Sequence, residues 1–504
     1  MNPGGSRHGA GVVLAWMGLL LCLLLSACGQ AKRDELRFGL ASMPVTLDPR
    51  YATDAASTRI IRLLYQRLVE FDDSAMPRPG LAHWEEISPT HYRFTLDVPR
   101  ATFSDGSALT AADVKASFDS VLDPATASPH RISFANIAAI EISGADIIDF
   151  HLQRADPLFP GRLGLGIMPA AAISRGYAFN RASLGSGAFE VLAWPSDGEL
   201  QLRRRSDGVG LGFVLVPDPT VRVLKVLRGE IDMLQNELPP ELVAYLRGRD
   251  EVRVSQSAGS TFAYIGFNLR DAVTSQLAVR QAVAHAIDRA AIIRYVLDDT
   301  ARLGGSILPP EHWAGVTGLD GFSYDPALSR QLLTKLGYEA PGSLKIVYKT
   351  STDPVRVRIA TVIQRQLKEV GIDVELRSYD WGTFYGDIKA GNFQMYSLSW
   401  VGVKLPEIFR YVFHSSSLPP SGANRGFFVS PAADRLIDDV EAAPDLAHQL
   451  EPLHALQRQL IDELPYVPLW YEDQIFVARA GISGYRIASD GNYDSLAEVT
   501  RVSP

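Results

Sequence analysis

The sequence predicts an α/β protein in which helices flank a sheet and the chain forms two or three lobes. Strand-like and helix-like segments alternate over residues 344–400, which is typical of a sheet covered by helices. The 504 residues exceed the length that one hydrophobic core usually serves. No repeat array or low-complexity linker divides the chain, so we expect the lobes to share strands.

Periodicity and helix caps predict the elements of the first half. Side chains that alternate between apolar and polar predict strands at 36–40 and 92–98, and a short apolar run predicts another at 213–216. Apolar residues at helical spacing predict a helix over 58–69. Thr110 is a suitable N-cap for a helix over 111–122, and Asp113 supplies a carboxylate at its third position. A further helix is predicted over 221–228, where a glycine follows it.

The second half alternates more regularly. Strands are predicted at 262–269, 344–348, 372–376, 394–400 and 466–476. Helices are predicted at 278–297, 355–370, 383–389, 432–441 and 446–464. Gly371 and Gly391 follow two of these helices, where a left-handed residue commonly ends the helix.

The N-terminus has the layout of a secretory signal, with Arg7 before an apolar run over 10–25 and small residues after it. The ending Leu-Ser-Ala-Cys at 25–28 resembles the lipobox of bacterial lipoproteins. That resemblance implies a mature chain that begins at Cys28 and carries a lipid anchor on its thiol. A retained transmembrane anchor and an ordinary signal peptide are the alternatives, and the apolar run is short for a membrane span.

Composition excludes several other classes. The formal net charge is -8 and basic residues are scattered, so we expect no nucleic-acid partner. The two cysteines, Cys22 and Cys28, both lie in the N-terminal segment, so the mature chain is predicted to contain no internal disulfide. No later stretch is apolar for long enough to span a bilayer.

The sequence lacks the common catalytic motifs. It contains no Gly-x-Ser-x-Gly elbow, no His-Glu-x-x-His, no Cys-x-x-Cys and no Walker A loop. The nearest string, at 185–187, is better explained as a turn. We therefore expect a protein that is not an enzyme and that needs no metal or cofactor. A secreted hydrolase built from residues distant in sequence stays open.

Short blocks in a fixed order carry a family resemblance. They are TLDP at 46–49, LYQRLV at 64–69, LAHWE at 81–85, YRFTL at 92–96, FSDG at 103–106, LTAADV at 109–114, GSGAF at 185–189, GEID at 229–232, FN at 267–268, VRQAV at 279–283 and AIDR at 286–289. In this order they resemble the family-5 extracellular solute-binding proteins, which are the peptide, nickel and heme receptors of ABC importers. Each block alone is weak evidence for the family, but chance does not explain the order in which all of them occur.

The resemblance implies a periplasmic-binding-protein-like bilobed clamshell (type II, cluster C-like) with an extra smaller domain in the first lobe. Ligand would lie in the cleft between the lobes, which close over it. The expected divisions are a lipoprotein signal peptide at 1–27, lobe I at 28–60, 183–268 and 479–504, an extra subdomain at 61–182, and lobe II at 269–478.

The function implied is that of a lipid-anchored, monomeric receptor in the cell envelope, outside the cytoplasm. It would capture a peptide or peptide-like solute and deliver it to an ABC permease. The same fold could instead bind a nickel chelate, heme, a sugar or an anionic solute, although the dispersed histidines count against heme or direct metal ligation. An envelope enzyme or chaperone-like protein is the third alternative.

One departure from the family bears on the ligand. In peptide-binding members an aspartate closely follows a Ser-Trp pair and binds the amino terminus of the peptide. Here Trp400 is followed by Val403 at the expected position and then by Lys404. Because an unpaired buried ammonium is costly, this mode of anchoring is not expected. Glu407 could replace the aspartate only if the loop is remodelled.

Three cations near this loop suggest an anionic ligand. Lys404, Arg410 and Arg425 could together meet a carboxylate, for which arginine offers two parallel hydrogen bonds. The competing interpretation is that these cations are solvated or paired with Glu407 and Asp434.

The remaining candidates lie on strand ends. Trp400 could stack on a ligand or belong to the core. Backbone groups of Val401 and Gly402 could pair with an extended ligand. Tyr264 and Asn268 could line the cleft or pack the hinge. Asn424, which precedes Arg425, completes the predicted ligand-binding set.

Overall fold

A computed structural model describes residues 35–97 and 101–502 of the chain. The predicted signal peptide and Cys28 lie outside these residues. Within them, no helix combines the length and apolar character that a membrane span requires.

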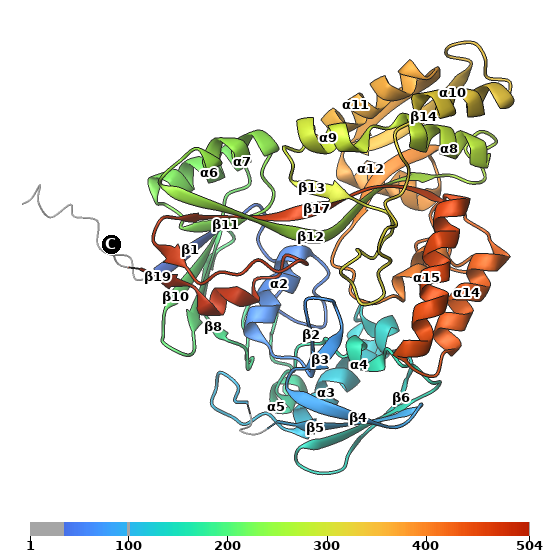
Figure 1. Cartoon of the computed structure of the whole chain (residues 1–504). Coiled ribbons are helices and arrows are strands. Elements are labelled where there is room, and N and C mark those ends of the chain that lie inside the picture. The colour runs from blue at the N-terminus through green and yellow to red at the C-terminus, as the bar shows by residue number, and fades with distance from the viewer. Residues whose placement is uncertain (1–34, 98–100, 503–504) are drawn as a thin grey trace, which may run out of the picture.

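A single 11-stranded sheet extends from one lobe into the other, in the order β15-β14-β16-β12-β17-β11-β1-β10-β9-β8, with β13 paired to β17 (Figure 1). Its strands are β1 (Glu35–Leu40), β8 (Phe189–Ser196), β9 (Glu199–Arg204), β10 (Gly210–Leu215), β11 (Met233–Gln235), β12 (Val252–Phe267), β13 (Ala301–Leu303), β14 (Leu344–Ser351), β15 (Ile372–Tyr379), β16 (Met395–Trp400) and β17 (Tyr466–Arg479). The lobes therefore share strands, as the sequence predicted.

The antiparallel strands β12 and β17 form the connection between the lobes (Figure 1). Their pairing is interrupted between Ser257 and Thr261, opposite Gln474 and Glu472. At Gly259, within this interruption, an added Cβ would lie 2.0 Å from the Glu472 carbonyl oxygen, so only glycine fits. A break in a sheet ladder bends a strand locally, which makes this the natural hinge of the ribbon.

Lobe I is built around a core to which distant segments contribute. Phe38 on β1 packs its ring against Phe213 on β10 and Tyr493 near the C-terminus, with ring centroids 5.6 Å and 4.9 Å away. The helices of this lobe are α2 (Ala55–Leu64), α6 (Pro219–Arg228) and α7 (Pro240–Arg247), and its short C-terminal strands are β18 (Ile482–Ser483) and β19 (Thr500–Arg501). Gly229 ends α6 in the left-handed conformation, as predicted.

The subdomain has its own core, formed by residues between Leu68 and Ile167. Its elements are β2 (Val69–Phe71), β3 (Pro77–Pro79), β4 (Ala82–Ser88), β5 (His91–Leu96), α3 (Ala111–Leu122), β6 (Ile137–Ile142), β7 (Ile147–Leu152) and α4 (Phe159–Arg162), and α5 (Ala170–Ser174) follows it with Ala172 in the core of lobe I. The predicted cap of α3 is confirmed, since Thr110 and Asp113 form a reciprocal capping box.

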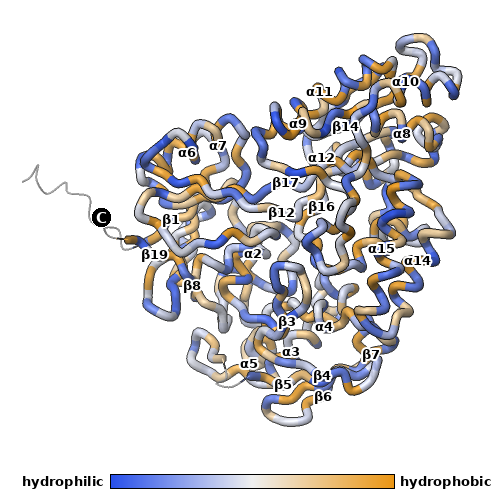
Figure 2. The backbone as a smooth tube through the Cα atoms, viewed as in Figure 1, coloured by the Kyte–Doolittle hydropathy of each residue, from blue (hydrophilic) through white to orange (hydrophobic). Residues whose placement is uncertain are grey.

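Lobe II packs helices on its part of the sheet, around two hydrophobic clusters. Its helices are α8 (Leu277–Ala286), α9 (Arg289–Tyr295), α10 (Pro326–Lys335), α11 (Pro354–Glu369), α12 (Trp381–Ala390), α13 (Ile408–Phe413), α14 (Pro431–Ala442) and α15 (Leu446–Glu463). Figure 2 shows α14 and α15 alternating between hydrophilic and hydrophobic residues, as expected for helices with one face on a core.

Two predicted helices are wrong in extent. The helix predicted over 278–297 is broken into α8 and α9, because Asp288 leaves the helix and caps α9 through the Ala291 backbone N–H. The helix predicted over 58–69 ends at Leu64, because Val69 pairs in a hairpin instead.

The domain divisions stay a prediction. The hydrophobic clusters favour a subdomain narrower than 61–182, since Tyr65 and Met168 both belong to the core of lobe I.

Candidate functional site

The loop at 401–407, which follows β16 of lobe II, reaches both other parts of the molecule. Lys404 Nζ lies 2.7 Å from Asp490 Oδ2 in the C-terminal segment of lobe I. The same ammonium lies 5.0 Å from the centre of the Phe71 ring on β2 of the subdomain. Glu407 forms an ion pair with Arg162 at the end of α4. Two ion pairs and a cation–π contact thus hold this loop against lobe I and the subdomain.

The segment at 312–314 forms a second connection, which joins this loop to the subdomain. His312 Nδ1 accepts the Ala314 backbone N–H at 3.0 Å, so Nε2 carries the proton and donates to the Lys404 carbonyl at 2.9 Å. Burial lowers the pKa of His312 to about 4, which keeps the ring neutral. The Trp313 backbone N–H donates to the Ser74 carbonyl of the subdomain at 2.9 Å.

A cavity of about 330 Å³ lies where lobe I, the subdomain and this loop meet. Its walls are formed by Pro49, Ala52, Thr58, Ile61, Arg62, Arg67, His130, Ser133, Phe134, Gly161, Arg162, Gly164, Leu165, Gly166, Leu405 and Glu407. This volume falls within the range of small-molecule pockets. An added Cβ at Gly164 would meet no atom within 4 Å, so glycine leaves space open at that wall.

The cations of the cavity wall have acidic partners. Arg62 and Arg67 both pair with Glu70, and Arg62 also pairs with Asp494. Burial acts to raise the pKa of Asp490, but Lys404 and Arg62 outweigh it and hold that pKa below its usual range. The charges of this wall are therefore already balanced by the protein itself.

Arg425 presents a different electrostatic situation on lobe II. Its guanidinium lies between the rings of Trp400 and Tyr385, 5.0 Å and 5.2 Å from their centres. Nη2 donates one hydrogen bond to the Tyr385 hydroxyl at 3.0 Å. Only 8% of Arg425 is exposed. Within the described parts of the chain, no carboxylate forms an ion pair with this buried cation.

Three buried tyrosines surround the same guanidinium. Apart from one another, the hydroxyls of Tyr264, Tyr396 and Tyr466 and the Trp400 indole N–H have no hydrogen-bond partner among the described residues. The rings of Tyr264 and Tyr466 stack with centroids 3.9 Å apart. Burial raises the pKa of each tyrosine, so all three hydroxyls keep their protons. Polar groups that have only one another as partners thus gather near one cation.

The other predicted ligand residues differ in their surroundings. Val401 is 58% exposed, Gly402 adopts a positive φ of 69°, and Val403 packs on the core of lobe II. Arg410 pairs with Asp438 and Glu441 on α14, so its charge is neutralised within lobe II.

Both predicted asparagines brace the backbone. The Asn424 side-chain amide donates to the carbonyls of His414 and Phe428. The Asn268 amide donates to the carbonyls of Gly391 and Phe393. The amide groups of both side chains are therefore engaged in holding loops of lobe II in shape.

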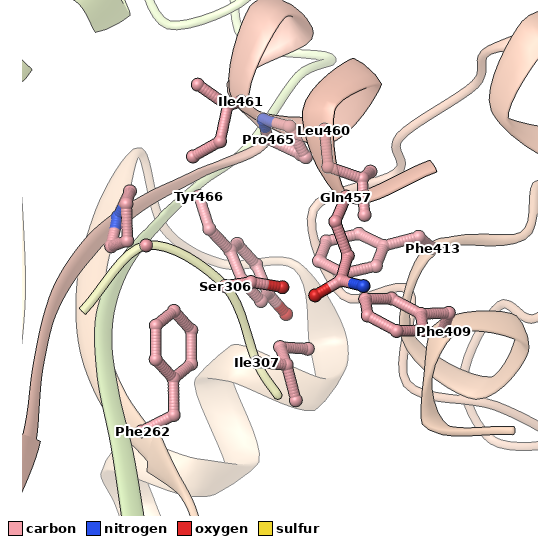
Figure 3. A pocket seen from close by; sticks show the side chains of 12 residues that line it. Phe262, Ser306, Ile307, Phe409, Phe413, Gln457, Leu460, Ile461, Pro465 and Tyr466 are labelled. Atoms are coloured by element: carbon pink, nitrogen blue, oxygen red, sulfur yellow. The ribbon is translucent and has the colours of Figure 1, made fainter. Parts of the chain in front are cut away.

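A much smaller cavity lies beside Tyr466 (Figure 3). Its volume is about 30 Å³, and Figure 3 shows Phe262, Tyr466 and Gln457 around it. That space accommodates a water molecule or two, and it is too small for a solute. Metal ligation lacks a visible basis as well, since no three His, Cys, Asp or Glu side chains of the described residues are grouped for it.

Sequence reasoning missed the partners that give this region its character. Asp490, Phe71 and Arg162 contact the predicted loop but lie far from it in sequence. Tyr385 lies within a predicted helix, and no motif marks it as a neighbour of Arg425. Only the charges of Lys404 and Arg425 gave a local signal.

Comparison with known proteins agrees with this architecture. Residues 76–417 match the family model described as bacterial extracellular solute-binding proteins, family 5 Middle. The oligopeptide-binding protein AppA of Bacillus subtilis is 23% identical over 93% of this chain and 94% of its own length. The probable di/tripeptide-binding protein 5 of Pseudomonas aeruginosa is 26% identical over 86% of this chain and 89% of its own.

Solved structures share the fold at low sequence identity. The ABC transporter substrate-binding protein CtaP of Listeria monocytogenes superposes with a TM-score of 0.84 at 20% identity, covering 93% of this chain and 99% of its own. NikA of Brucella suis, in complex with Fe(III)-EDTA, gives the same TM-score at 21% identity and the same coverage. The fold is thus the bilobed clamshell that the sequence predicted, and the family model spans more than half of the chain. The protein therefore belongs to family 5 of the bacterial extracellular solute-binding proteins, a family of binding proteins.

Proposed function

We propose that the protein is the substrate-binding component of an ABC importer, which captures a peptide or peptide-like solute between its lobes and delivers it to a membrane permease. The observation that carries this proposal is the cavity of about 330 Å³ whose walls come from lobe I, the subdomain and the lobe II loop. A solute there would contact all three parts, so binding and closure would be coupled.

The names of similar proteins support the peptide class. The relatives include oligopeptide-, dipeptide-, di/tripeptide- and glutathione-binding proteins. Some structural neighbours hold other ligands, namely Ni(L-His), agropinic acid and Fe(III)-EDTA. A non-peptide solute is therefore the second candidate. Lys404 favours this second candidate, because it lies in the loop where peptide-binding members carry an aspartate. Its ammonium also pairs with Asp490, so that carboxylate is not free to bind the amino terminus of a peptide.

The proposal includes the cellular setting. We propose that Cys28 carries a lipid that anchors the protein to a membrane, that the mature monomer lies in the cell envelope outside the cytoplasm, and that it works without a cofactor. The lipobox-like string at 25–28 supports the anchor. Metabolic labelling with a palmitate analogue tests it, since Cys28→Ser is expected to abolish incorporation.

Ligand identification tests the proposed function most directly. The protein would be purified without added ligand and analysed by mass spectrometry, because buried solutes often copurify. Thermal unfolding against a panel of di- to pentapeptides would then measure binding. We expect a peptide or peptide-like molecule to copurify and to raise the melting temperature on being added back. Turnover of a substrate panel, or a panel without any stabilising peptide, would contradict the proposal.

A matched pair of variants locates the site. Gly164→Leu fills the cavity wall where an added Cβ meets no neighbour. Gly386→Leu adds the same side chain to α12, where an added Cβ likewise meets no atom within 4 Å and which lies outside the cavity wall. Binding is expected to fall at least tenfold in Gly164→Leu only. Equal affinity in both variants would move the binding site away from this cavity.

A further inference from the structure

Arg425 differs from the other cations near the cleft because its charge has no acidic partner. Lys404, Arg62 and Arg162 each form an ion pair within the protein. Arg425 is buried to a similar or greater degree, and within the described residues its side chain contacts one hydroxyl and two aromatic rings. A buried charge without a counter-ion is strongly unfavourable, so the site is electrostatically incomplete.

The geometry around Arg425 determines what could complete it. The rings of Trp400 and Tyr385 cover the guanidinium, as in other arginine–aromatic stacks. Only its edge then remains for hydrogen bonding, and a guanidinium carries five N–H donors. One of them is used, by the Tyr385 hydroxyl. A planar carboxylate is the acceptor that matches such an edge with two parallel bonds.

The neighbouring hydroxyls have the same chemical preference. Tyr264, Tyr396 and Tyr466 place three protonated hydroxyls beside the guanidinium, and apart from one another and the Trp400 indole N–H these hydroxyls have no hydrogen-bond partner among the described residues. A cluster of donors around a cation complements negative charge. Val401, directly after Trp400, is exposed and begins the loop at 401–407, which contacts lobe I and the subdomain.

We propose that Arg425, clamped between Trp400 and Tyr385, is the group that binds a carboxylate of the transported solute. This inference rests on the proposed function and narrows its ligand class to molecules with an accessible carboxylate, either terminal or on a side chain. On binding, the carboxylate replaces the Tyr385 hydroxyl as the acceptor of the guanidinium N–H. A charged acceptor forms the stronger hydrogen bond, so the exchange is favourable.

The first test needs no variant. Wild-type protein is titrated with peptides that bind it, each as the free acid and as the C-terminal amide, and with matched peptides that carry Glu or Gln. We expect the carboxylate-bearing member of at least one pair to bind 30-fold or more tightly, about 2 kcal/mol. A difference in the acid–amide pair assigns the terminal carboxylate, and one in the Glu–Gln pair assigns a side chain. Equal affinities in both pairs would overturn the inference while leaving the proposed function intact.

The second test assigns the preference to this residue. Arg425→Gln is expected to remove the discrimination between acid and amide, and Arg425→Lys to retain only part of it, because lysine cannot bind in bidentate fashion. Arg365→Gln is the control, since Arg365 is an exposed arginine on α11 of the same lobe. Discrimination that survives Arg425→Gln would overturn the assignment.

A failure of the proposed function would be recognised separately. If no peptide binds the wild-type protein, the peptide function fails, and Arg425 is judged with acetate and succinate against acetamide and succinamide. Thermal stabilisation by the carboxylates that is lost in Arg425→Gln would support the inference. Absence of any stabilisation by them would overturn it.

Discussion

Replacing Lys404 by methionine removes the ammonium that joins lobe II to lobe I while keeping most of the side-chain volume. In the closed structure this ammonium pairs with Asp490 at 2.7 Å and lies over the Phe71 ring. Opening of the lobes would break both contacts. We therefore expect Lys404→Met to shift the ligand-free protein toward open forms, because the lost interaction exists only in the closed one.

The size of the shift follows from the burial of the pair. The side chains of Lys404 and Asp490 are 25% and 13% exposed. Exposed ion pairs contribute up to about 1 kcal/mol, and breaking a buried pair costs roughly 3–5 kcal/mol. A half-buried pair lies between these limits, at about 2 kcal/mol. That free energy corresponds to a decrease of about 30-fold in the ratio of closed to open molecules.

Single-molecule energy transfer measures this ratio. The two natural cysteines lie at 22 and 28, so a form beginning at residue 29 accepts dyes at Glu85→Cys on the subdomain and Arg330→Cys on lobe II. Lys404→Met is expected to deplete the short-distance population, whereas Lys368→Met, an exposed lysine on α11, should not. In an Asp490→Asn background the effect of Lys404→Met should largely vanish. An equal effect in both backgrounds would refute the ion-pair explanation.

Two further changes test local features by thermal unfolding. His312 has a pKa of about 4, below its ordinary 6.5, so the unfolded chain binds the proton first and stability falls by up to roughly 3 kcal/mol as the pH drops from 6.5 to 4. This pH dependence of the unfolding free energy should be lost in His312→Gln and kept in His448→Gln, since His448 is exposed. Identical slopes of unfolding free energy against pH in the two variants would contradict the assignment to His312. Gly185→Ala would set a Cβ 1.9 Å from the Leu64 carbonyl oxygen and should cost about 3 kcal/mol. Gly386→Ala, inside α12, should stabilise the protein by up to about 1 kcal/mol. Equal melting temperatures of the Gly185→Ala and Gly386→Ala variants would contradict this steric account.

Local chemistry explains which parts of the fold the sequence predicts well. The capping box of Thr110 and Asp113 is contained within four residues, so the start of α3 could be read directly. Gly371 and Gly391 likewise take positive φ angles after α11 and α12. Such signals depend on neighbours in sequence, which are visible before any tertiary structure is known.

Tertiary contacts explain where sequence reasoning failed. The residues around Asp288 do not indicate whether it lies inside a helix or caps a new one, as it does for α9. The next residue, the buried Arg289, donates hydrogen bonds to backbone carbonyls of segments that are distant in sequence. Periodicity therefore merged two helices. For the same reason, Leu68 fitted a helical spacing although it belongs to the core of the subdomain.

The candidate site shows the same limit. The sequence could nominate Lys404, Arg410 and Arg425 as cations, but only the folded chain shows which of them has a partner. Arg410 is neutralised by α14 and Lys404 by Asp490, and both partners lie outside the local motif. Among these three cations, only Arg425 has no carboxylate partner within the described residues. This difference depends on contacts between residues that are distant in sequence.

Small-angle X-ray scattering on a form that lacks the two ion pairs of the loop at 401–407 tests the central claim most directly. In the double variant Lys404→Met/Arg162→Met, this loop loses its ion pairs to Asp490 and across Glu407, so closure depends more strongly on bound ligand. We predict that the ligand-free variant has a larger radius of gyration than the closed structure, and that a binding solute returns it to the closed value. Scattering curves that coincide with and without bound solute would contradict a protein that works by closing its lobes.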